Sequence, residues 1–202
     1  MALTPGSAVF LDTNILVYAS FPGTPFYDAA RARLSELESD GALFWTSRQA
    51  LREFLASTTR PGAVVPPPTI AALSQAVRQF EAEFEIADED AAVTALLLDV
   101  LKSRTVRGKQ IHDANIVATM RRYGIPWLLT HNTADFTRYV PDINLLPLVS
   151  WGKREGKGTF PAASSGSSRD TPLTESRNRR SRPKQRANRQ VFVNQWPVDT
   201  IT

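Results

Sequence analysis

The 202-residue chain contains no cysteine and only two histidines, His112 and His131. Without cysteine it cannot form disulfides, zinc–thiolate sites or a cysteine nucleophile. A zinc site built on histidine and carboxylate would need more ligands at tighter spacing than these two residues provide. The sequence also lacks a glycine-rich phosphate loop, and Ser47 and Ser57 lack the context of a hydrolase nucleophile. These absences exclude several common classes of catalytic site.

Long hydrophobic runs are also missing. The first residues lack a basic region followed by an apolar stretch, so no signal peptide is evident. The longest run rich in alanine and leucine, residues 91–98, is far too short to span a bilayer. The lack of cysteine fits a reducing compartment. We therefore expect a cytoplasmic protein with no membrane association.

The net charge of +4 is unevenly distributed along the chain. Residues 151–202 hold 11 Lys and Arg against 4 Asp and Glu, which gives +7. Residues 1–150 hold 24 − 11 = 13 basic and 20 − 4 = 16 acidic residues, which gives −3. The basic character therefore belongs to the C-terminal segment and is no sign that the rest of the chain binds nucleic acid.

Short apolar segments alternate with longer amphipathic ones along residues 8–149. The short segments are typical of buried strands, and the longer ones repeat apolar residues at the helical period. The expected strands are residues 8–11, 42–46, a short one near Ile86, 126–130 and 144–149. The expected helices are about 25–38 after the cap Thr24, one after the cap Ser47, one from the cap Thr69 to about 84, about 89–103 after the cap Asp88, and about 112–123 before Gly124.

This alternation predicts an α/β protein with a three-layer α/β/α fold around a central, mainly parallel sheet. Such sheets carry functional groups at the carboxyl ends of their strands. Asp12 and the segment 130–135 lie at two such ends.

The C-terminal segment has a different composition. Residues 162–168 are small, and residues 177–189 are basic, broken by proline and almost free of apolar side chains. Such a segment buries too little surface to offset its ordering entropy. We therefore expect one folded domain over residues 1–150 and a mostly disordered, basic, low-complexity tail over residues 151–202.

Four acidic motifs occur in order on the expected elements. Carboxylates that meet from distant parts of a chain repel one another, and a hard divalent cation with a preference for oxygen ligands relieves that repulsion. Bound magnesium or manganese would also activate water for hydrolysis of a phosphodiester. The motifs are Phe10-Leu11-Asp12-Thr13-Asn14, Leu51-Arg52-Glu53-Phe54, Ile111-His112-Asp113-Ala114-Asn115 and Thr130-His131-Asn132-Thr133-Ala134-Asp135-Phe136.

The order and context of these motifs resemble the PIN-domain family over residues 8–149, and in particular the VapC-type toxins of bacterial toxin–antitoxin pairs. The resemblance implies a PIN-like fold and a ribonuclease that depends on Mg²⁺ or Mn²⁺. It also implies a cognate antitoxin as protein partner and a homodimer. The helical segments between residues 26 and 84 are the candidate surfaces for these contacts.

The resemblance also implies roles for individual residues. Asp12 and Asp113 would be the core metal ligands, and Glu53 would bind the metal directly or orient a metal-bound water. Asp135 would be the fourth acid. Many family members have an aspartate where Asn132 stands, and the neutral amide leaves open whether a second metal binds. Polar side chains that hold carboxylates or contact phosphate would be Thr13, Asn14 and Asn132.

Simpler interpretations of each residue remain open at this point. Asp12, Asp113 and Asp135 could each be a cap or turn former, and Glu53 could be a solvated helix residue. The chain could also be a degenerate, non-catalytic PIN-fold protein that binds RNA or acts as an adaptor. A phosphatase with an aspartyl-phosphate intermediate is a further alternative, although such enzymes need a second aspartate where this chain has Asn14.

Basic residues flank the third motif. Arg104, Arg107 and Lys109 precede Asp113, and we expect them either to contact RNA phosphates at the mouth of the site or to form an ordinary solvated loop. The arginines of the tail either add sequence-independent affinity for RNA or belong to a dispensable extension.

Overall fold

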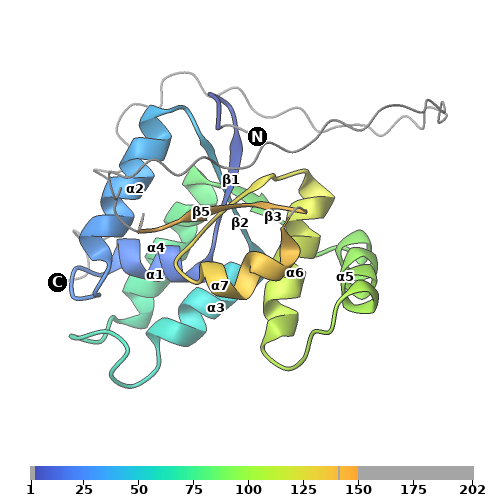
Figure 1. The fold of residues 1–202 in the computed structure, drawn as a ribbon. Helices are drawn as coiled ribbons and strands as arrows, with labels where there is room; N and C mark the ends of the chain where they lie inside the picture. Colours follow the sequence, from blue (N-terminus) through green and yellow to red (C-terminus); the bar gives the residue numbers. More distant parts are fainter. Residues whose placement is uncertain (1–2, 141, 150–202) are drawn as a thin grey trace. The chain divides into compact units, whose positions relative to one another are not determined.

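The computed structural model describes residues 3–140 and 142–149. Five strands and seven α-helices alternate along this part of the chain (Figure 1). The strands are β1 (Ala8–Leu11), β2 (Leu43–Ser47), β3 (Glu85–Ala87), β4 (Trp127–Thr130) and β5 (Asn144–Pro147). The helices are α1 (Thr13–Ser20), α2 (Tyr27–Ser39), α3 (Arg48–Thr58), α4 (Ile70–Glu83), α5 (Ala91–Ser103), α6 (Gln110–Tyr123) and α7 (Thr133–Phe136), which a short 3₁₀ helix (Thr137–Tyr139) follows.

The five strands form one sheet in the order β3-β2-β1-β4-β5, and every neighbouring pair is parallel. The chain builds outward from β1 to β2 and β3 on one side, and then crosses to β4 and β5 on the other. The point where the direction of building reverses lies between β1 and β4. Open parallel sheets bind their ligands outside the carboxyl ends of the strands at such a point.

The sheet separates two apolar cores. Val9 and Leu11 of β1 pack with side chains of α1, α2, α3 and α4, whereas Phe10 faces the opposite side and packs with α5, α6 and the α7 region. This alternation follows from the two-residue period of a strand. On the second side, α5 and α6 lie against each other (Figure 1). The predicted three-layer α/β/α fold is therefore confirmed, and its sheet is parallel throughout the described residues.

Helix α1 is absent from the predicted elements, because the segment after Asp12 was expected to be only a turn. Its sequence, TNILVYAS, is rich in the β-branched and aromatic residues that favour strands. The segment is helical because Ile15, Leu16 and Ala19 are buried against the first core, while Asp12 caps its first turn. Tertiary packing overrides local propensity at this point.

Two helix starts differ from the prediction. Helix α2 begins at Tyr27 and not near residue 25, since the Thr24 hydroxyl donates to the carbonyls of Tyr18 and Phe21 and does not cap the helix. Helix α5 is capped by Asp90, whose side chain accepts from the Val93 N–H at 2.9 Å. Asp88, the expected cap, forms an ion pair with Arg48.

Helix α7 and the 3₁₀ turn after it were also not predicted, because four residues are too few to show a helical period. The predicted disorder of residues 151–202 falls outside the described residues. Within the described ranges, no helix is both long enough and apolar enough to cross a membrane.

Candidate active site

Asp12 lies at the carboxyl end of the central strand β1 and caps helix α1. Its Oδ1 accepts a hydrogen bond of 2.7 Å from the Thr13 backbone N–H. Its Oδ2 accepts bonds of 2.6 Å from Asn14 Nδ2 and from Thr130 Oγ1, which lies at the end of β4. Three donors therefore fix one carboxylate at the point where the building of the sheet reverses.

Burial dominates the electrostatics of Asp12. The residue is only 6% exposed, and its pKa is raised overall from 3.8 to about 6, with desolvation by burial as the largest cause. The hydrogen bonds from Thr130, Thr13 and Asn14 lower the pKa, and the charge of Glu53 raises it again. Burial and the neighbouring acid therefore destabilise the ionised form of the Asp12 carboxylate.

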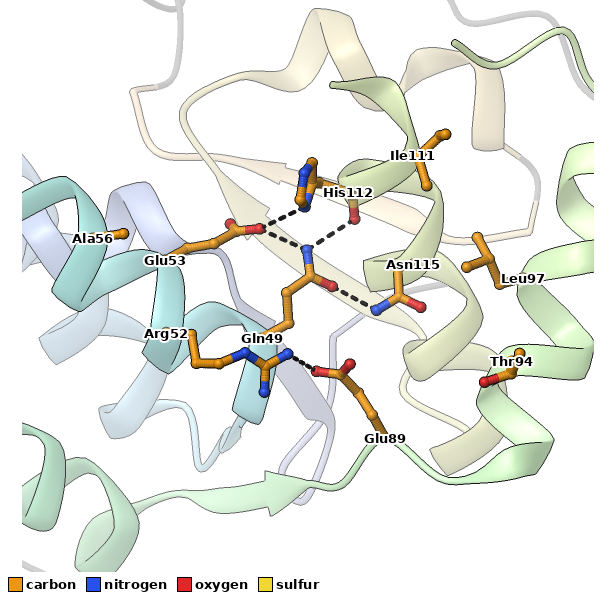
Figure 2. A pocket seen from close by; sticks show the side chains of 10 residues that line it. All are labelled: Gln49, Arg52, Glu53, Ala56, Glu89, Thr94, Leu97, Ile111, His112 and Asn115. Atoms are coloured by element: carbon orange, nitrogen blue, oxygen red, sulfur yellow. Dashed lines mark hydrogen bonds and ion pairs between the residues drawn. The ribbon is translucent and has the colours of Figure 1, made fainter. Parts of the chain in front are cut away.

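Glu53 approaches from helix α3 and shares a partner with Asp12. The Thr13 hydroxyl donates to Glu53 Oε2 at 3.1 Å, while the Thr13 backbone N–H binds Asp12. Glu53 Oε1 accepts from Gln49 Nε2 at 2.7 Å and lies 3.1 Å from His112 Nδ1 (Figure 2). The carboxylate of Glu53 is therefore tied to α1, to its own helix and to the first turn of α6.

A pair of amides supports this arrangement. Gln49 is 6% exposed, and besides Glu53 its Nε2 contacts the His112 carbonyl oxygen at 3.2 Å. Gln49 Oε1 accepts from Asn115 Nδ2 at 2.6 Å (Figure 2). Gln49 thus connects α3 to α6 and holds Glu53 close to the helix that carries Asp113.

Asp113 lies in the first turn of α6 and is half-buried. Its pKa is raised from 3.8 to about 6, most of all by burial and then by the charges of Asp135, Asp12 and Glu53, in that order, whereas His112 lowers it. Such mutual effects require that the four carboxylates lie in one electrostatic environment. Acids separated by up to 123 positions in the sequence therefore converge at one edge of the sheet.

The remaining predicted residues lie at the periphery. Asp135 is exposed on α7 and acts on Asp113 through its charge. Asn132 is also exposed, and its contact with the site is made by the backbone N–H, which donates to Thr130 Oγ1 at 3.0 Å. Asn14 is more central, since its Oδ1 accepts from the His131 N–H at 3.0 Å while its Nδ2 binds Asp12.

The donor set suits a hard divalent cation, because it consists of carboxylate oxygens whose mutual repulsion a cation would relieve. The side chains are not at ligating distance, however. Among residues 3–140 and 142–149, no group of three or more acidic or histidine side chains is arranged to hold a metal ion.

Comparison with known families decides what this site belongs to. The family model of the PIN domain matches residues 9–140. The chain belongs to the PIN-domain family. No curated protein sequence matches the chain.

Solved structures show the same PIN fold. VapBC2 from Rickettsia felis, bound to a promoter DNA fragment, is 20% identical with a TM-score of 0.51, and the match covers 69% of this chain and 98% of that chain. A toxin–antitoxin complex from Klebsiella pneumoniae is 22% identical with a TM-score of 0.50 over 71% of this chain and 98% of that chain. At these identities the likeness shows the fold alone.

In this PIN domain the three basic residues near α6 differ in their surroundings. Arg104 is tied to the protein: Nε donates to the Arg138 carbonyl oxygen at 3.0 Å, and the guanidinium pairs with Asp142 Oδ2 at 2.5 Å. Arg107 and Lys109 are exposed. Of the three residues predicted to contact RNA, Arg107 and Lys109 are therefore on the surface, and Arg104 is held by contacts within the protein.

Sequence analysis of the PIN domain missed three residues that organise the site, namely Thr130, Gln49 and Asn115. Thr130 had a usable signal, because it ends an apolar strand and is the first residue of the fourth motif. Gln49 and Asn115 had none, since glutamine and asparagine on helices are usually exposed. His112, which precedes Asp113 in the third motif, contacts Glu53.

Proposed function

We propose that the protein is a ribonuclease that hydrolyses RNA phosphodiester bonds with Mg²⁺ or Mn²⁺, and that residues 1–150 carry this activity. One observation carries the proposal: Asp12, Glu53 and Asp113 come from three different elements and meet at the switch point of the sheet, where burial and mutual repulsion raise the pKa of Asp12 and of Asp113. Acids whose pKa values are raised by burial and by one another mark a functional site, and a bound cation would relieve their repulsion.

The residues divide the work as follows. Asp12 and Asp113 would hold the cation, and Glu53 and Asp135 would complete its ligands directly or through water. When bound, the metal supplies a polarised water and neutralises charge on the phosphodiester. Thr13, Asn14 and Thr130 keep the Asp12 carboxylate in one orientation through donated hydrogen bonds. In the overall reaction, water adds to phosphorus as the bond to one ribose oxygen breaks and that oxygen gains a proton.

The geometry at Asn14 argues against an aspartyl-phosphate phosphatase. Such an enzyme needs an acid two residues after the nucleophilic aspartate. Here the Asn14 amide donates to Asp12 Oδ2 and supplies no acidic proton. The Asp12 carboxylate is also engaged by three donors, which suits a ligand better than an attacking nucleophile.

We further propose that this ribonuclease is the toxin of a toxin–antitoxin pair, with a cognate antitoxin as partner and a homodimeric assembly. The similar structures from Rickettsia felis and Klebsiella pneumoniae, a VapBC protein and a toxin–antitoxin complex, support this partner. Size-exclusion chromatography with light scattering, with and without the protein encoded by the neighbouring gene, tests both parts. A monomer that fails to bind the neighbouring product would contradict them.

The activity is tested by RNA cleavage with Mg²⁺, with Mn²⁺ and with chelator. We expect cleavage by the wild type that chelator abolishes, and at least a roughly thousandfold loss in Asp12→Asn and in Asp113→Asn. Asp40→Asn, an exposed acid at the end of α2, is the matched control and should cleave like the wild type. Cleavage that survives chelation would reject the metal dependence. Absence of both cleavage and metal binding would reject the proposal in favour of a non-catalytic RNA-binding protein.

A further inference from the structure

A groove of about 470 Å³ opens beside the carboxylates, between helices α3, α5 and α6 (Figure 2). Glu53 and His112 belong both to the candidate active site and to the wall of this groove. Leu97 of α5 and the partly exposed Ile111 of α6 give it apolar sides. Its volume lies in the usual range of small-molecule sites, and Glu53 links it to the candidate active site.

The amides at the base of the groove have a fixed polarity. The Glu53 carboxylate and the His112 carbonyl are acceptors, so the atom of Gln49 that faces them must be its NH₂ group. Gln49 then presents Oε1 to Asn115, and Asn115 must donate its own NH₂ group to it. The Oδ1 atom of Asn115 is left as the acceptor that faces away from Gln49 (Figure 2). The groove therefore offers a hydrogen-bond acceptor in a set position.

The charges in the groove do not favour a second phosphate. Glu53 lies on one wall, and the Arg52 guanidinium is already paired with Glu89 at 2.8 Å. A ligand that suits this groove is flat and uncharged, with apolar faces and an N–H donor on its edge. An unpaired nucleobase has these properties, because it stacks on side chains and donates from its Watson–Crick edge.

From these contacts we propose that the groove between α3, α5 and α6 binds the RNA base next to the scissile phosphate, with Asn115 Oδ1 accepting from that base. The inference rests on the proposed ribonuclease activity and extends it, since it makes Asn115 a residue that determines base preference. A base that turns its Watson–Crick edge towards Asn115 must be unpaired. The substrate is therefore RNA with a single-stranded segment at the cleavage site.

Binding can be tested without any cleavage. In chelator, the side-chain amide resonances of Asn115 are followed by NMR while short oligo-A, oligo-C, oligo-G and oligo-U are added to the full-length protein. We expect at least one RNA to shift these resonances. The variant Thr94→Trp places an indole in the groove from the exposed side of α5, and it should weaken that RNA about tenfold, the loss expected for one stacked base.

Leu98→Trp is the matched control, because Leu98 is an exposed residue of the same helix outside the groove lining. It should bind RNA like the wild type. Thermal unfolding establishes that both tryptophan variants are folded. If no RNA shifts the Asn115 resonances, or if Thr94→Trp binds all four RNAs like the wild type, the groove is not a base site. The second result is also the one expected if the groove serves a protein partner.

Cleavage separates this inference from the activity on which it rests. With Mn²⁺, the wild type is compared with Thr94→Trp and Asn115→Ala on RNAs that differ only in the bases beside the cut. We expect both variants to lose about tenfold in kcat/KM on the preferred RNA and to show a flatter base preference. Cleavage with an unchanged preference in both variants rejects the base site alone. Absence of cleavage by the wild type rejects the ribonuclease.

Discussion

The two sides of the carboxylate site are built differently. On the sheet side, Asp12 is buried at the end of β1 and receives hydrogen bonds from Thr13, Asn14 and Thr130. On the helix side, Glu53 of α3 and Asp113 of α6 are half-exposed, and Glu53 is held by an amide contact from its own helix and a hydroxyl contact from α1.

The difference shows that one half of the candidate site is held in place by hydrogen bonds to Asp12, whereas the acids of the other half are spread over two helices. The sheet side is preorganised, because three hydrogen-bond donors hold the Asp12 carboxylate in one orientation. They also offset part of the cost of burying its charge. The helix side keeps its charges apart, and no three acids stand at ligating distance within the described residues. If the proposed cation binds, Asp12 on the sheet side would be its fixed ligand, and Glu53 and Asp113 on the helix side would complete the ligand set.

The largest expected effect on activity comes from the loss of the Asp12 carboxylate on the sheet side. Asp12→Asn removes a buried ligand that nothing else can replace, so we expect a fall of about a thousandfold in kcat/KM. Glu53→Gln keeps the size of an adjustable side chain, and we expect a fall of only about ten- to a hundredfold. RNA cleavage at saturating Mg²⁺, together with calorimetric titration of the metal, measures both. Equal losses would show that the two sides do not differ.

Gln49 should have a smaller effect that is confined to the helix side. Gln49→Met keeps the volume but removes the bonds to Glu53, to the His112 carbonyl and to Asn115. We expect a loss of about tenfold in metal affinity and in kcat/KM, because Glu53 becomes free to leave its position. Gln75→Met, at an exposed position of α4, is the control and should change neither. Unchanged metal affinity in Gln49→Met would show that the amide has only a packing role.

The raised pKa of Asp113 predicts a stability effect of a few degrees. A folded-state pKa of about 6 against 3.8 means that the folded protein binds more protons than the unfolded chain in this window. The free energy of unfolding of the metal-free protein therefore falls as the pH rises from about 4 to 6. Asp113→Asn removes this penalty at pH 7.5. It should raise the free energy of unfolding by roughly 1–2 kcal/mol, and with it the Tm by about 3–6 °C.

The sign should change with conditions. Near pH 4 both proteins have a neutral side chain at this position, so the difference in Tm should largely vanish. With saturating Mg²⁺ at pH 7.5 the wild type should become the more stable protein, since it gains the free energy of binding. Asp40→Asn should follow the wild type throughout. A wild type that is the more stable protein without metal at pH 7.5 would contradict a strained helix side.

The same comparison explains what the sequence could predict. The sheet side was within reach, because β1 and β4 are short apolar runs that end at polar residues, and parallel strands bring those ends together. The four acids could be named because their motifs match those of a known family. Helix α1 escaped prediction because its buried face leaves no amphipathic pattern, and its residues favour strands when considered locally.

The helix side was less predictable for a physical reason. Whether Gln49 is an exposed surface residue or a buried link depends on how close α3 lies to α6, and nothing in its own sequence window carries that distance. The cap of α5 shows the same limit, since Asp88 and Asp90 are equally good caps in sequence. In the fold Asp88 pairs with Arg48, whereas Asp90 caps the helix and also pairs with Arg122.

The smallest effect concerns the basic residues before Asp113, and it tests whether the contrast between fixed and free side chains extends beyond the acids. Arg107 is exposed, and Arg107→Ala should weaken RNA binding two- to threefold and lower the salt slope by about 1, as expected for one lost phosphate contact. Arg104 instead lies over the Tyr139 ring and pairs with Asp142. Arg104→Ala should therefore lower the Tm and leave the salt slope unchanged. Arg78→Ala, at an exposed position of α4, is the control for the slope and should also leave it unchanged. Fluorescence anisotropy across a range of salt concentrations measures the slopes, and a reduced slope in Arg104→Ala would show that this arginine leaves its internal partners to meet RNA.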